Sequence, residues 1–149
     1  GAYQRLAKRL GVGSRVVFTG ERDDVPRFLS GADLLLHPAY RENTGTVLIE
    51  AMAAGLPVLA TENCGYSFHV KQARAGRLVP VPFDQKILND HLYTMLDREK
   101  DRIQWGKNGR AYVEKTDVYS RHEKAADAIE SVARHKRQPA AEFENHGHL

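Results

Sequence analysis

The amino-acid sequence predicts an α/β fold in which helices cover both faces of a doubly wound parallel sheet. Short apolar runs, each closed by Gly, Pro or Thr, recur along the first eighty residues, as in buried parallel strands. Stretches with helical periodicity separate these runs, and alternation of strand and helix builds the right-handed crossovers of a parallel sheet. In such a sheet, ligands bind at the carboxyl ends of the strands.

The first forty residues predict two helices and two strands. A helix is expected over 3–10, where four apolar residues recur at helical spacing before two glycines. The run at 16–18, Val-Val-Phe, is short, apolar and β-branched, and it predicts the first strand. Pro26 fits the first turn of a short helix, and the leucines at 34–36 predict the second strand.

The later elements continue the alternation and then become helical. The Ala-rich run that starts at Thr46 predicts a helix, with Gly55 as the residue after its end. Strands are expected at 57–61 and 76–79, followed by helices at 84–97 and 101–115. The expected domain organisation is a nucleotide-binding domain over 1–118, a C-terminal helix over 119–135 and a disordered tail over 136–149.

The composition restricts the class of protein. The 22 Lys and Arg residues and the 19 Asp and Glu residues are spread along the chain, so we expect no nucleic-acid partner. The single cysteine, Cys64, cannot form an internal disulfide, and neither a leader nor an apolar span of about 18 residues is visible, which favours the cytoplasm. Because the sequence opens directly on a helix without Met, we expect a fragment of a longer protein.

The loop and helix after the second predicted strand carry the chemistry. If a helix begins near Thr46, the free amides of residues 45–48 and the positive end of the helix dipole form a site for phosphate oxygens. Glu50 lies about one turn further along, roughly the span from a diphosphate to its ribose. Glu42 precedes the phosphate site. The order of Glu42, Gly45–Thr46 and Glu50 thus matches the sugar, diphosphate and ribose of a nucleotide sugar.

These residues resemble a known family. The Glu-x7-Glu element, with HPAYRENTGTVLIEAMAAGLPVLAT at 37–61 and VVFTGERDDVPRFLSGADLLLHP at 16–38, is similar to the C-terminal, Rossmann-like domain of the retaining, two-domain B-fold glycosyltransferases of family four. More narrowly, HPAYRENTG, AGLPVL, CGY at 64–66 and YSRHEKAADAI at 119–129 resemble the lipopolysaccharide-core heptose glucosyltransferases.

The resemblance implies a role for each matching residue. Glu42 would hold the hydroxyls of the transferred hexose, and Glu50 the ribose. The backbone at Asn43, Thr44, Gly45 and Thr46, continued by Val47, would offer amides to the hexose and the phosphates, and the loop from Gly20 to Arg22 would lie by the base. The basic pair that the family places on the diphosphate, and its acceptor-binding domain, are absent. His37 ends a strand on the ligand side, where it fits either a hydrogen bond to sugar or phosphate or a packing role.

The implied reaction is transfer of glucose from UDP-glucose to an inner-core heptose of lipopolysaccharide, with retained configuration. The acceptor would be reached at the inner face of the bacterial inner membrane, which implies a peripheral membrane contact. We expect no cofactor and no metal, because Asp23 and Asp24 fit an N-cap and a first-turn charge better than a metal-holding pair. The alternatives are a B-fold transferase or epimerase that uses another nucleotide sugar, and a non-catalytic nucleotide-sugar-binding module.

Overall fold

A three-stranded parallel sheet is the centre of the computed structural model, which describes residues 1–116. Its strands are β1 (Leu35–His37), β2 (Val58–Thr61) and β3 (Gly76–Val79), hydrogen-bonded in the order β1-β2-β3. Leu35 pairs with Val58, which in turn pairs with Gly76, so the three strands end at the same edge. The predicted parallel sheet is confirmed.

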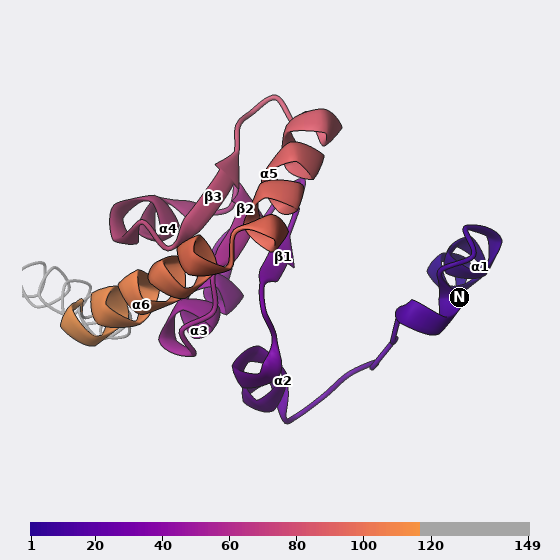
Figure 1. Cartoon of the computed structure of the whole chain (residues 1–149), viewed down its shortest axis with the longest axis horizontal. Coiled ribbons are helices and arrows are strands. Elements are labelled where there is room, and N and C mark those ends of the chain that lie inside the picture. The colour runs from indigo at the N-terminus through magenta and orange to yellow at the C-terminus, as the bar shows by residue number, and fades with distance from the viewer. Residues whose placement is uncertain (117–149) are drawn as a thin grey trace, which may run out of the picture.

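Residues 1–116 contain seven helical segments, six of them α-helices. They are α1 (Ala2–Arg9), the 3₁₀ turn η1 (Gly13–Arg15), α2 (Val25–Gly31), α3 (Thr46–Ala53), α4 (Ser67–Ala73), α5 (Gln85–Asp97) and α6 (Glu99–Lys115). Helix α1 lies apart from the sheet (Figure 1). The helix that starts at Thr46 is confirmed, and Gly55 follows it in the left-handed conformation, at φ +76°. The helix and tail predicted beyond residue 116 lie outside the described residues.

The sequence analysis missed α4. The helix is short, and two of its three buried residues are polar, namely Ser67 and His69 beside Val70. His69 Nδ1 lies 2.8 Å from the hydroxyl of Tyr112 on α6, so the buried face is held by a polar contact. An apolar periodicity, which is the main sequence signal for a helix, is therefore weak at this position.

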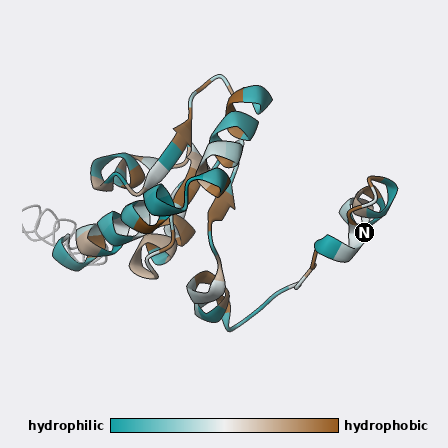
Figure 2. Ribbon diagram, in the orientation of Figure 1, coloured by the Kyte–Doolittle hydropathy of each residue, from teal (hydrophilic) through white to brown (hydrophobic). Residues whose placement is uncertain are grey.

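Two hydrophobic clusters, one on each face of β2, form the core. Val58 and Ala60 pack with α3 and α4, while Leu59 packs with Val79 and with Leu88 of α5. Figure 1 shows α5 and α6 lying along the sheet with α3 and α4 beside it, and Figure 2 shows largely brown strands, much teal on α5 and α6, and a largely tan α3. Coverage of both faces is what a doubly wound sheet requires, and it confirms the predicted class.

The strand predicted at 16–18 is wrong. These residues are extended but pair with no strand of the described chain, and the side chain of Val17 is 83% exposed. Figure 1 shows the segment leading from α1 to α2 away from the sheet. An apolar, β-branched run becomes a strand only where a neighbouring strand pairs with it, and residues 1–116 supply no such neighbour.

Helix α6 approaches α3 closely through a glycine. A Cβ at Gly106 would lie 2.1 Å from the carbonyl oxygen of Gly55, at the turn after α3. We expect Gly106→Ala to lower the free energy of unfolding by about 1–3 kcal/mol despite the better helix propensity of alanine, since the added methyl overpacks this contact. Urea unfolding measures the change.

The matched control is Gly31→Ala at the end of α2, where an added Cβ meets nothing within 4 Å. This variant is expected to unfold like the parent protein. Equal or greater stability of Gly106→Ala would contradict the close packing of α6 on α3.

Candidate functional site

The loop after β1 and the loop after β2 pair with each other at the carboxyl edge of the sheet. Glu42 and Cys64 form an isolated parallel bridge that extends the pairing of these strands. The amide of Gly65 donates to the carbonyl of Glu42 at 3.2 Å, and the amide of Tyr66 donates to the carbonyl of Thr44 at 2.8 Å. The loop that carries Glu42 is therefore held by backbone hydrogen bonds where parallel sheets bind ligands.

Gly45 is required where this loop turns into α3. Its φ of +73° lies in the left-handed region, which glycine adopts at little cost. A Cβ at this position would lie 2.2 Å from the sulfur of Cys64, so no larger residue fits without movement of the loop. The close contact sets the start of α3 against the loop after β2.

The N-terminus of α3 is open to an anion. Gly45 occupies the N-cap position, no side chain caps the helix, and its first turn contains no acidic residue. Thr46 is exposed and Val47 is half-buried. The amide of Leu48 donates to the carbonyl of Gly45 at 2.9 Å, so the amides without a carbonyl partner in the helix are those of residues 45–47, and not of 45–48 as predicted. The free amides and the helix dipole together favour binding of a negatively charged group at Thr46.

Glu50 is the only charged residue of α3 and is exposed, one turn after Thr46. Its neighbours on the helix, including Ile49 and Ala51, are buried in the core. Among residues 1–116, Glu50 has no hydrogen-bonded or ion-paired partner for its carboxylate. Its carboxylate is thus free to accept hydrogen bonds from a molecule bound at the helix N-terminus.

Glu42 lies beside His37. The distance from His37 Nε2 to Glu42 Oε2 is 3.9 Å, and the two side chains are 25% and 35% exposed. His37 Nε2 is itself buried and makes no hydrogen bond within the described residues. The structure therefore brings together two residues that the sequence analysis selected separately, and it leaves a nitrogen of His37 facing the carboxylate that the resemblance assigns to the hexose.

Cys64 is a packed thiol under this loop. Its side chain is 2% exposed and belongs to the core cluster around α3. Burial raises the pKa of the Cys64 thiol, and the charge of Glu42 raises it further. A protonated, buried thiol is a poor nucleophile, so Cys64 supports the loop by packing.

The segment that the resemblance places by the base precedes α2. Gly20 is exposed with open space around it, and Arg22 forms a bidentate ion pair with Asp24, at 2.8 and 2.9 Å. This pair lowers the pKa of the Asp24 carboxyl. Of the N-cap and first-turn charge predicted for Asp23 and Asp24, only the N-cap is confirmed: Asp24 occupies that position of α2, and the first turn contains no acidic residue. The carboxylate of Asp24 bonds to Arg22 instead of capping the helix. No hydrogen bond or ion pair in the described residues joins Gly20 or Arg22 to Glu42 or Glu50.

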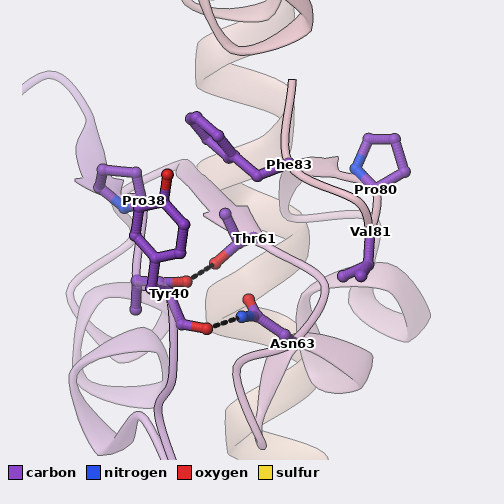
Figure 3. Close-up of a pocket in the computed structure, with 8 residues that line it drawn as sticks. Pro38, Tyr40, Thr61, Asn63, Pro80, Val81 and Phe83 are labelled. Atoms are coloured by element: carbon purple, nitrogen blue, oxygen red, sulfur yellow. Dashed lines mark hydrogen bonds between the residues drawn. The ribbon is translucent and has the colours of Figure 1, made fainter. Parts of the chain in front are cut away.

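The sequence analysis missed a pocket over the ends of all three strands (Figure 3). Its volume is about 160 Å³, and it is lined by Pro38, Ala39, Tyr40, Thr61, Asn63, Pro80, Val81 and Phe83. The available signal was the position of Tyr40 and of the Pro-rich run at 80–82 directly after predicted strands. Such residues also occur in ordinary turns, so the sequence alone did not single them out.

Within 1–116, no three His, Cys, Asp or Glu side chains form a group that could hold a metal ion. In the same part of the chain, no helix is long and apolar enough to cross a membrane.

Comparison with known proteins identifies the family of this chain. Residues 2–112 match the family described as glycosyl transferases, group 1. The lipopolysaccharide glucosyltransferase WaaG of Escherichia coli K12 is 46% identical over 127 residues, which cover 85% of this chain and 34% of WaaG. A D-inositol 3-phosphate glycosyltransferase of Corynebacterium efficiens is 34% identical over 71% of this chain and 25% of its own length.

Two solved structures superpose on most of this chain. The crystal structure of WaaG superposes with a TM-score of 0.81, covering 86% of this chain and 35% of WaaG. Anabaena HepE, solved in complex with UDP-glucose, superposes with a TM-score of 0.74 at 27% identity, covering 87% of this chain and 36% of HepE. The chain therefore spans about a third of the length of these two relatives.

Proposed function

Because this chain belongs to the group 1 glycosyltransferase family, we propose that it is the donor-binding part of a retaining hexosyltransferase that moves glucose from UDP-glucose to an inner-core heptose of lipopolysaccharide. The observation that carries the proposal is the site at the carboxyl edge of the sheet, where an uncapped helix N-terminus lies between two glutamates. A relative at 46% identity is a lipopolysaccharide glucosyltransferase, and a structural neighbour was solved with UDP-glucose.

Each part of the donor has a proposed partner. The diphosphate lies at the amides of Gly45, Thr46 and Val47, and the ribose hydroxyls donate to the carboxylate of Glu50. Glu42 accepts hydrogen bonds from the hexose, which also lies against the backbone of Asn43 and Thr44. The loop from Gly20 to Arg22, which precedes α2, lies by the base in this proposal.

His37 positions Glu42 in this arrangement. Its buried Nε2, 3.9 Å from Glu42 Oε2, becomes a hydrogen-bond donor to the carboxylate after a small movement of either side chain. One carboxylate oxygen then stays free for the sugar. The alternative role of His37 is a hydrogen bond from its side chain to the sugar or phosphate. That bond would require Glu42 to move aside.

The proposed chemistry relies on fixed electrostatics. As the bond from the anomeric carbon to the diphosphate breaks, negative charge accumulates on the leaving oxygen at the helix N-terminus and positive charge grows on the sugar ring near Glu42. The acceptor hydroxyl attacks the same carbon and passes its proton to the leaving diphosphate oxygen, so that the products are the glycosylated acceptor and UDP. The amides and the glutamate are in place before the reaction, so little reorganisation is needed as charge develops.

The proposed setting is the cytoplasmic side of the bacterial inner membrane, with a peripheral contact, since the acceptor is a lipid-linked sugar. The partners are the nucleotide sugar and the lipopolysaccharide core, with no nucleic acid, cofactor or metal. The complete enzyme, meaning this chain joined to the remaining length that its relatives have, would supply the acceptor-binding domain and the basic pair for the diphosphate.

Transfer by the complete enzyme tests the function. With heptose-terminated lipopolysaccharide core as acceptor, we expect labelled glucose from UDP-glucose to be incorporated, and incorporation to continue in excess EDTA because the helix N-terminus and basic residues carry the phosphate charge. Competition among nucleotide sugars identifies the donor. A preference for another donor would contradict the glucose assignment, and loss of turnover in EDTA with recovery in magnesium would contradict metal independence.

A further inference from the structure

The pocket over the strand ends is not used by the donor contacts proposed above. It lies between the loops that follow β1, β2 and β3, and Figure 3 shows Tyr40 and Pro38 on one side, Phe83 above and Val81 on the other side. The rings of Tyr40 and Phe83 are 5.7 Å apart at an angle of 46°. Tyr40 is 80% exposed and Val81 63% exposed, so apolar surface at this pocket faces solvent.

Polar groups sit at the base of these apolar walls. The hydroxyl of Thr61 donates to the carbonyl of Ala39 at 2.7 Å, and the side-chain amide of Asn63 donates to the carbonyl of Tyr40. An amide group has two donor hydrogens and an acceptor oxygen, so Asn63 keeps a donor and an acceptor for a ligand. The two bonds also fix the loop that carries Tyr40.

The chemistry of the lining selects a class of ligand. None of the eight lining residues is charged, which argues against a diphosphate or a carboxylate as the occupant. Aromatic and aliphatic walls with a few fixed hydrogen-bonding groups suit a small neutral molecule with one apolar face and several hydroxyls. A sugar ring has this character.

The position of the pocket decides between the transferred sugar and the acceptor sugar as its ligand. Tyr40 precedes Glu42 by two residues, so their backbones are at most about 7 Å apart. In the proposed function, Glu42 holds the transferred hexose, and the acceptor hydroxyl must come within about 3–3.5 Å of its anomeric carbon. The second sugar ring at the reaction centre therefore lies within reach of this pocket.

We propose that the pocket formed by Tyr40, Asn63 and Phe83 binds the acceptor sugar ring, so that the donor-binding domain contributes one side of the acceptor site. This inference rests on the proposed function. The rings of Tyr40 and Phe83 pack against the apolar face of the sugar, and Asn63 bonds to its hydroxyls. Donor affinity does not depend on these contacts.

Kinetics of the complete enzyme test the pocket. Tyr40→Ala and Phe83→Ala are each expected to raise KM for the heptose acceptor about tenfold, as loss of an aromatic anchor does, and to leave KM for UDP-glucose unchanged. Tyr40→Phe keeps the ring and should show a smaller increase. Tyr93→Ala removes an exposed tyrosine of α5 that does not line the pocket and should behave like the parent enzyme.

The results separate this inference from the function itself. If KM for the acceptor is unchanged in both alanine variants, the assignment of the pocket to the acceptor is overturned. Glucose transfer by the parent enzyme would still support the proposed function. Weaker binding of UDP-glucose but not of UDP assigns the pocket to the transferred hexose, and weaker binding of both assigns it to the nucleotide; either result overturns the acceptor assignment. Phe83→Leu preserves apolar packing, so an acceptor KM raised in Phe83→Leu as well as in Phe83→Ala, with UDP binding intact, supports the proposal independently of folding.

Discussion

Glu42→Gln is expected to lower kcat of the complete enzyme by about tenfold to somewhat over a hundredfold, with a smaller effect on KM for the donor. The range corresponds to the loss of one charge-assisted hydrogen bond, worth roughly 1.5 to 3 kcal/mol. In our proposal Glu42 faces the hexose as positive charge develops on its ring, so the carboxylate stabilises the transition state more than the ground state. Steady-state kinetics with saturating acceptor measure both parameters.

The second glutamate provides the contrast. Glu50 faces a ribose that does not change during the reaction, so Glu50→Gln should raise KM for UDP-glucose by a similar factor and leave kcat largely unaltered. Glu114→Gln on α6, where the only ion-pair partner in the described chain is Arg110 at 3.6 Å, is the control and should leave both parameters unaltered. A pure KM effect at Glu42, or normal kinetics at either glutamate, would remove the proposed roles.

The chain by itself is expected to transfer no sugar, which is the largest effect that we predict. The chain covers only 34% of the length of WaaG and 25% of that of the D-inositol 3-phosphate glycosyltransferase. Most of the acceptor site and the basic pair for the diphosphate lie outside this chain in our proposal, so neither the acceptor hydroxyl nor the leaving charge is fully stabilised. Incubation with labelled UDP-glucose and lipopolysaccharide core measures this directly.

Joining the chain to the remaining length of the enzyme is the matching experiment and should restore glucose incorporation. Clear turnover by the isolated chain would show that its own residues complete the active site, and it would contradict the requirement for a second domain.

Local pattern was sufficient for the central elements. The strands near 35–37, 58–61 and 76–79 and the helix from Thr46 are fixed by residues adjacent in sequence, namely apolar runs bounded by breakers and an Ala-rich stretch before Gly55. The segment at 16–18 has an equally good strand pattern but no partner among the described residues. Pairing depends on residues distant in sequence, so pattern alone could not decide it.

In the site, too, local features could be predicted from the sequence and long-range contacts could not. The order of Glu42, Gly45 and Glu50 could be read from spacing along one loop and one helix. The approach of His37 to Glu42 and the fit of Gly45 against Cys64 depend on how β1 and β2 place their following loops side by side. The pocket of Tyr40, Asn63 and Phe83 draws on three loops from distant parts of the sequence, and no local signal connects them.

The central claim is that the start of α3 and Glu50 bind the donor. A titration of this chain with UDP, monitored by amide chemical shifts in the NMR spectrum, tests it most directly. The account predicts saturable binding in which the amides of residues 45–47 shift most, and weaker binding by Glu50→Gln, because the phosphates bond to the start of α3 and the ribose to Glu50. Shifts centred elsewhere with residues 45–47 unaffected, or the absence of UDP binding by the folded chain, would contradict it.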